Sequence, residues 1–261
     1  MTPIITLLIT SLLVSLGINM TLFAIAYLKQ TDKFTDFSYA LSFASVAMYG
    51  YWVSERSILD AAVLAMVLAW SLRLGGYLAY RIHVIGRDTR FDEFRHEFWG
   101  FFKFWFFQGL AAWVILMPAM FIFSSQSPGR IGLLSMLGIA IWAVGLTIET
   151  VADMQKFNHK QEKRSPAWVD SGLWHYSRHP NYFGEMVCWW GIFVMTLPIM
   201  TSQWHVGVII SPLTIMAILI FASGIPPLER RYQKKYGNDP EYQKYLRETS
   251  RVMLWTKYNK A

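Results

Sequence analysis

The chain has 261 residues, of which 54% are hydrophobic and only 16% are charged, and its mean hydropathy is positive at +0.30. Soluble domains usually carry close to a quarter charged residues, so this composition excludes an ordinary soluble domain and favours a polytopic membrane protein. The net charge of +7 comes without a nucleic-acid-binding module, and a single cysteine excludes a disulfide framework.

Seven apolar segments are long enough to cross about 30 Å of hydrocarbon as helices. We expect spans at residues 4–28, 37–54, 58–80, 98–123, 131–152, 182–200 and 204–223. The first has no early basic residue and no cleavage site, so we interpret it as a retained span and not a signal peptide. No repeat or linker is visible, so residues 1–261 are expected to form a single all-α membrane domain, a seven-transmembrane-helix bundle with a cytoplasmic tail at 226–261.

Positive charge is distributed unevenly between the two sets of loops. Of the 24 Lys and Arg residues, 20 fall after the first, third and fifth spans or in the C-terminal tail. Because cytoplasmic loops are enriched in Lys and Arg, we expect the N-terminus outside and the C-terminus in the cytoplasm. Two explanations for this basic side stay open, namely attraction to anionic lipid headgroups and binding of an anionic ligand.

Ionisable residues inside or beside spans are costly and therefore mark candidate sites. Arg73, in the third span, needs either a structural ion pair or a polar ligand. At the end of the fifth span a stripe of residues follows helical spacing: Glu149, Asp153, Lys156 and Lys160. The stripe fits either salt bridges at the membrane exit, or a site whose carboxylates bind a ribose or an amide while its lysines meet phosphate.

The segment SGLWHYSRHPNYFGEMVCWWG, residues 171–191, places polar side chains directly before an apolar span. Pro180 suits the first turn of a helix and disfavours helical geometry at His179, so the sixth span should start near Asn181. A helix N-terminus beside Arg178 and His179 is suited to an anion, although capping and interfacial anchoring are the structural alternative. Pro180 also interrupts the metal-like spacing of His175 and His179, so we predict no metal site.

The tail after the last span reads GIPPLERRYQKKYGNDPEYQKYLRETSR. Asp239 is expected to cap a short amphipathic helix that has Pro240 in its first turn. This helix carries Tyr242 and Tyr245, and we expect it to lie on the membrane surface.

Three of these motifs resemble one known group of proteins. ADMQKF at 152–157, GLWHYSRHPNYFGE at 172–185 and GIPPLERRY…YG…EYQKY in the tail are similar to a bacterial membrane family of the steroid 5α-reductase superfamily. The resemblance is strong over residues 145–250, and the RHPNY core is shared more loosely with sterol C14 and C7 reductases and isoprenylcysteine methyltransferases. It implies a multi-pass enzyme of the bacterial inner membrane that uses NADPH on the cytoplasmic side. The implied reaction is reduction of a carbon–carbon double bond conjugated to a carbonyl in a lipid, such as a 3-oxo-Δ4-steroid.

The resemblance also implies roles for individual residues. NADPH would be held by residues from four parts of the chain: Arg87 and Arg90 after the third span; Glu149, Asp153, Lys156 and Lys160 on the fifth; Tyr176, Arg178, His179, Asn181, Tyr182 and Glu185 around the start of the sixth; and Arg230 and Tyr232 in the tail. Family members polarise the substrate carbonyl with a Glu near the second span and a Tyr on the third. Here Asp36 takes the first position and Trp70 stands at the second, so Tyr77 is expected to supply the phenol.

Two other functions stay open. A membrane methyltransferase using S-adenosylmethionine shares the RHP and tail motifs, but its cofactor has no phosphates to explain basic residues such as Arg87 and Lys156. A non-enzymatic lipid-binding or transport protein would need neither a nucleotide nor the pair Glu149 and Asp153. We therefore expect NADPH as the cofactor, a membrane lipid or steroid as the substrate, and no nucleic acid.

Overall fold

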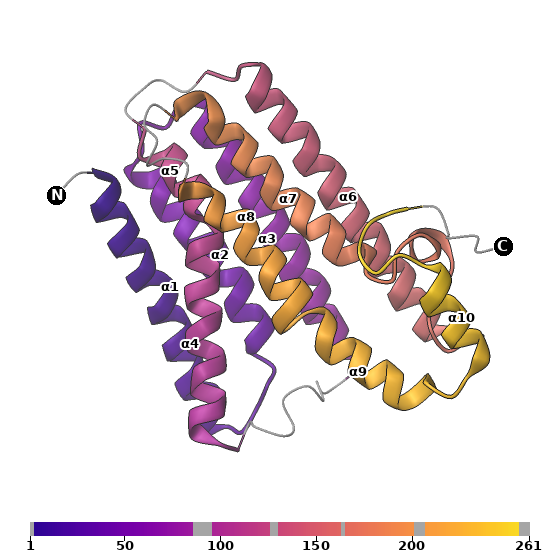
Figure 1. Ribbon diagram of the computed structural model, residues 1–261. Coiled ribbons are helices and arrows are strands. Elements are labelled where there is room, and N and C mark those ends of the chain that lie inside the picture. Colours follow the sequence, from indigo (N-terminus) through magenta and orange to yellow (C-terminus); the bar gives the residue numbers. More distant parts are fainter. Residues whose placement is uncertain (1–2, 86–95, 126–129, 163–164, 201–206, 256–261) are drawn as a thin grey trace. The chain divides into compact units, whose positions relative to one another are not determined.

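A computed structural model describes residues 3–85, 96–125, 130–162, 165–200 and 207–255 (Figure 1). Within these ranges the elements are helices, and the one β-type pairing is an isolated bridge between Ser177 and Ser250. The expected all-α class is therefore confirmed. The chain divides into two compact units, one of residues 1–136 with 192–211, and one of residues 137–191 with 212–261.

Six segments of the described chain are helical, long and apolar enough to cross a membrane. They are Ile4–Leu28, Ile58–Leu78, Phe98–Ile115, Leu133–Gln161, Pro180–Ile199 and Gly207–Tyr236. They coincide with six of the seven expected spans and support a multi-pass membrane protein. The remaining expected span, at 37–54, forms a helix, α2 (Thr35–Val53), that is not among the six.

The first unit contains α1 (Pro3–Leu28), α2, α3 (Ile58–Ile85), α4 (Phe98–Ile115), α5 (Met117–Phe123) and η3 (Leu197–Ile199). In this unit α2 packs against α1, α3 and α4. Its buried serines are used there, because Asn19 of α1 donates to Ser42 Oγ at 2.9 Å and Gln108 of α4 donates to Ser38 Oγ at 2.7 Å. Ser38 and Ser42 are therefore satisfied by neighbouring helices, as is typical of helix contacts inside membranes.

The expected span at 98–123 is interrupted. α4 ends at Ile115 and α5 begins at Met117, with Pro118 in the first turn of α5. Proline has no backbone N–H to donate to the preceding turn, so a new helix starts there.

The second unit contains most of α6 (Leu133–Gln161) and of α7 (Pro180–Thr196), with the short 3-10 turn η2 (Gly172–His175) between them. It continues through most of α8 (Ile210–Ala217) and the π-helical turn η5 (Ile218–Ala222) to α9 (Ile225–Tyr236) and α10 (Pro240–Glu248). The predicted start of α7 at Pro180 and the predicted cap of α10 are confirmed, since Asp239 Oδ1 accepts a hydrogen bond from the Glu241 amide at 2.9 Å.

α6 and α7 approach each other through glycines. A Cβ atom at Gly145 would lie 2.6 Å from the backbone nitrogen of Cys188, and one at Gly184 would lie 2.5 Å from the backbone nitrogen of Glu149. Both separations are shorter than real Cβ contacts, so only glycine permits this spacing, as in other closely packed membrane helices. The antiparallel register brings Glu149 and Asp153 of α6 next to the first turns of α7.

Candidate functional site

The start of α7 lies beside the polar stripe of α6. Asn181 Nδ2 donates to Asp153 Oδ1 at 3.1 Å, and Gly184 packs on the backbone of Glu149. Glu149, Asp153 and Glu185 are all buried. The Asn181 side-chain oxygen is also buried and has no hydrogen-bond partner among the described residues. The fold therefore groups these predicted residues and leaves one acceptor of Asn181 available.

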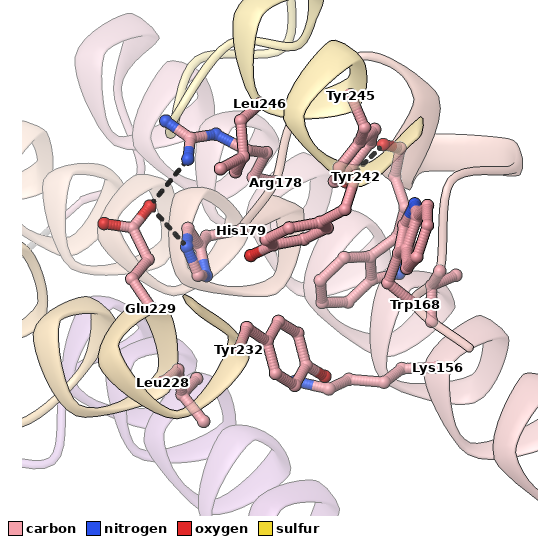
Figure 2. Close-up of a pocket in the computed structure, with 12 residues that line it drawn as sticks. Lys156, Trp168, Arg178, His179, Leu228, Glu229, Tyr232, Tyr242, Tyr245 and Leu246 are labelled. Carbon is pink, nitrogen blue, oxygen red and sulfur yellow. Dashed lines mark hydrogen bonds and ion pairs between the residues drawn. The ribbon is translucent and has the colours of Figure 1, made fainter. Parts of the chain in front are cut away.

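A pocket lies one turn further along α6, within the second unit (Figure 2). It is bounded by Lys156 of α6, by the segment that connects α6 to α7, and by residues of α9 and α10. Its enclosed space is small, about 20 Å³, although the hollow including its open mouth measures about 410 Å³. Small-molecule sites typically occupy about 300–1,000 Å³, so the lining side chains would have to move apart to admit a nucleotide.

Glu229 of α9 is the centre of the polar wall of this pocket. Its Oε1 lies 3.0 Å from Arg178 Nη1 and 3.4 Å from His179 Nε2, and Figure 2 shows both contacts. Its Oε2 accepts hydrogen bonds from Arg251 Nη2 at 2.9 Å and Arg251 Nε at 3.1 Å. One carboxylate thus orients three basic side chains. Arg178 Nε, in contrast, is buried and has no hydrogen-bond partner within the described chain.

His179 is neutral at physiological pH. Burial lowers the pKa of His179 to about 4, and the nearby charges of Lys156 and Arg178 act in the same direction, whereas the contact with Glu229 opposes the shift. A neutral ring protonated on Nε2 can donate to Glu229 Oε1, and the ring also stacks on Tyr182 with centroids 5.7 Å apart. The positive charge that faces the pocket therefore comes from Lys156 and Arg178.

Aromatic rings form the opposite wall. Trp168 packs against Tyr242 of α10 with ring centroids 5.1 Å apart, and both side chains are buried together with Tyr245. Burial raises the pKa of Tyr242 to about 12, so its phenol also stays neutral. The aromatic face of α10 is therefore buried against the protein and does not face lipid, while its position at the membrane surface stays a prediction. Trp168 Nε1 is a second donor without a partner among the described residues.

Hydrogen bonds hold the segment between α6 and α7 in place. Trp174 Nε1 donates to the carbonyl of Ala152 at 3.0 Å, and Tyr245 Oη donates to the carbonyl of Trp174 at 3.0 Å. Gly172 has a φ of +62°, a conformation that favours glycine, and the next amide bonds Gln155 Oε1 at 3.0 Å. The segment therefore bridges α6 and α10.

The chain after α10 is fastened to the residues that precede α7. The backbone amide of Arg178 donates to the carbonyl of Ser250 at 2.8 Å, and Ser177 Oγ donates to the carbonyl of Val252 at 2.7 Å. Together with the Arg251–Glu229 ion pair, these bonds make residues 249–252 a support for the polar wall.

The predicted site residues fall into four groups. Lys156, Arg178, His179 and Tyr232 line the pocket. Glu149, Asp153, Asn181, Tyr182 and Glu185 lie next to it on α6 and α7. Lys160, Tyr176 and Arg230 are exposed and do not line it. Arg87 and Arg90 lie outside the described residues.

The predicted catalytic residues belong to the first unit. Tyr77 is half-buried on α3, whereas Asp36 lies on α2 with its side chain outside the described part. Trp70 is fully buried against Phe43, and a Cβ at Gly75 would lie 3.2 Å from Ala40 Cβ. In this antiparallel register Tyr77 is level with Ser38, about half a turn from the level of Asp36.

Several pocket residues were missed by sequence reasoning. Glu229 was recognised as part of a tail motif but was not assigned to the site. Trp168 lies in a segment without helical periodicity, and Tyr242 and Tyr245 were assigned to a membrane surface. The aromatic pattern of α10 did signal an apolar face, but it did not identify the protein surface that covers this face.

One family profile matches the chain. It describes a protein of unknown function (DUF1295), and the match covers residues 22–249. No curated protein and no solved structure matches the chain at a significant level.

Proposed function

The chain belongs to the DUF1295 family, whose function is unknown, and we propose from its own residues that it is an NADPH-dependent membrane reductase. The substrate would be a lipid enone resembling a 3-oxo-Δ4-steroid, which would place the protein in the steroid 5α-reductase superfamily. The observation that carries the proposal is a set of three buried polar atoms without partners in the described chain: Asn181 Oδ1, Arg178 Nε and Trp168 Nε1.

These three atoms fit the two ends of a nicotinamide dinucleotide. Asn181 Oδ1 can accept a hydrogen bond from a carboxamide N–H, while Arg178 Nε and Trp168 Nε1 can donate to phosphate or ribose oxygens. An unpaired buried polar group costs about 1–3 kcal/mol, so a ligand that pairs all three gains affinity at each. S-adenosylmethionine carries no phosphate, which makes it a poorer match for the two donors and Lys156.

The protein would contribute orientation and charge to the reaction. Asp153 holds the amide of Asn181, and Glu229 holds Arg178, so both ligand-facing groups have fixed positions. A reduced nicotinamide, when bound, would supply a hydride to the β-carbon of an enone, and a proton from water would complete the reduction at the α-carbon. A neutral Asp36 or the phenol of Tyr77 would donate a hydrogen bond to the enone carbonyl and make the β-carbon more electrophilic.

The proposal includes a topology. We propose that α2 is a seventh span, since only then do the loops with Lys29 and Lys33 fall on the same side as the other basic loops. The N-terminus would then lie outside and the C-terminal tail, with the cofactor site, in the cytoplasm of a bacterium. The serines of α2 do not oppose this, because α1 and α4 satisfy them.

Cofactor titration of the purified full-length protein tests the proposal. We expect NADPH to bind at least tenfold more tightly than NADH, because the additional phosphate meets basic residues. Equal affinity for the two, or tight binding of S-adenosylmethionine, would contradict the reductase.

Asn181→Ala provides the site-specific arm of this test. The variant should lose at least tenfold in NADPH affinity while its melting temperature stays within a few degrees of wild type. Asn158→Ala, at an exposed position of α6 outside the pocket lining, is the matched control and should bind as wild type does. Unchanged binding in Asn181→Ala would remove this residue from the site.

A further inference from the structure

Two sets of basic residues in the second unit differ in their surroundings. One set, Lys156 and Arg178, lines the pocket. The other set lies on α9, is exposed and does not line the pocket: Arg230, Arg231, Lys234 and Lys235. We call this second set the α9 basic stripe. The pocket accounts for the first set, whereas the four residues of the stripe lie outside its lining.

The two faces of α9 are used differently. Leu228, Glu229 and Tyr232 line the pocket, and Tyr236 packs against Trp168 with ring centroids 5.6 Å apart. The stripe residues recur at i, i+1, i+4 and i+5, so they form one continuous surface. This surface lies mostly opposite the pocket face, and Lys235 at its edge places Nζ 4.9 Å from the centroid of the Tyr236 ring. Because the apolar face is already occupied by protein, α9 does not attach to a membrane by burying that face.

We propose that the α9 basic stripe binds the anionic headgroups of the lipid leaflet that its own membrane segment enters. α9 belongs to the apolar segment Gly207–Tyr236 and is separated from η5 only by a bend at Gly224. Four cations on one surface next to such a segment are complementary to an anionic leaflet. Each cation near that leaflet strengthens binding roughly fivefold. The partner is a phosphate-bearing anionic lipid such as phosphatidylglycerol.

Lipid titration of the full-length protein in neutral detergent tests this inference. The melting temperature is followed by tryptophan fluorescence as phosphatidylglycerol or phosphatidylcholine is added. We expect phosphatidylglycerol alone to raise it by several degrees. Lys234→Gln combined with Lys235→Gln should weaken the apparent affinity for phosphatidylglycerol at least tenfold, and 0.5 M salt should weaken the wild-type response.

The control keeps the number of removed charges constant. Arg56→Gln combined with Arg130→Gln, exposed residues of the first unit that the proposed topology places on the opposite side of the membrane, should retain the wild-type response to phosphatidylglycerol. Equal stabilisation by both lipids, or an undiminished response in the Lys234 and Lys235 variant, would overturn the inference. Stabilisation by inorganic phosphate alone would also overturn it, because it would indicate a soluble anion. NADPH affinity is measured in parallel and should not change in either variant.

Discussion

At the scale of single residues, the pocket depends on how one carboxylate is shared. Glu229 contacts Arg178, His179 and Arg251, and both of its oxygens are used. Removing one partner of such a cluster leaves the other charges uncompensated. The free-energy cost of that change is larger than the stabilisation that the intact cluster provides. Glu229 therefore holds Arg178 through Nη1, while Arg178 Nε has no hydrogen-bond partner among the described residues.

His179 gives this cluster a pH dependence. Its pKa is about 4 in the folded protein and 6.5 in the unfolded chain, so between these values only the unfolded chain takes up the proton. Protonation then favours unfolding, and the free energy of unfolding should fall by about 3 kcal/mol as the pH falls from 7 to 4. Above pH 6.5 the His179 ring is neutral in both states, so it no longer lowers the free energy of unfolding.

His179→Gln isolates this contribution from other acid-titrating groups. Chemical unfolding in detergent, followed by tryptophan fluorescence at several pH values, should show a shallower loss of stability in the variant than in wild type. Parallel pH profiles for the two proteins would show that His179 is not the group responsible.

At the scale of helices, the α6–α7 contact determines whether the site exists. Gly145, Gly184 and Gly191 each place a backbone against the facing helix, and no Cβ fits at any of them. The same register brings Asn181 to Asp153. The close packing of α7 on α6 therefore also fixes the alignment of their polar residues.

Gly184→Val should separate these helices. A β-branched side chain would meet the backbone of Glu149 and Gly145, so we expect a loss of stability of about 3 kcal/mol or more together with loss of NADPH binding. Gly76→Val is a suitable control for the general cost of replacing a helical glycine, because a Cβ there has no atom within 4 Å. In thermal unfolding in detergent, Gly184→Val should melt at a clearly lower temperature than Gly76→Val. Equal melting temperatures would contradict the packing argument.

At the scale of the whole molecule, the distribution of charge and the membrane topology are coupled. Twenty of the 24 Lys and Arg residues share one side only if α2 crosses the membrane. The described helices include six apolar segments, and α2 is not among them. Ser42 and Ser38 of α2 accept hydrogen bonds from α1 and α4, so these polar residues would be satisfied if α2 crosses the membrane.

Cysteine labelling in intact cells tests this topology. The chain has one cysteine, Cys188, which is buried, so a Cys188→Ser background allows single reporter cysteines. We expect Glu55→Cys to react with an impermeant maleimide from outside, and Lys33→Cys only after permeabilisation. Met253→Cys serves as the cytoplasmic control and should behave like Lys33→Cys. Labelling of residues 33 and 55 from the same side would show that α2 does not cross.

Much of the architecture was accessible from the sequence because it depends on local or periodic features. Apolar runs of membrane-spanning length identified six helical segments, and Pro180 and Asp239 marked helix starts that the structure reproduces. The helical spacing of Glu149 and Asp153 placed both on one face. These properties require only the preference of each residue for its immediate neighbours along the chain and for an apolar or polar environment.

The pocket was decided by the tertiary structure. Its walls join Lys156, Trp168, Glu229 and Tyr242, residues separated by long stretches of chain, and Arg251 supports it from beyond the last helix. Periodicity shows that α10 has an apolar face, but the same pattern suits a lipid surface and a protein surface equally well. Only the packing of that face against Trp168 distinguishes the two, because burial depends on which segment arrives opposite it and not on the segment's own composition.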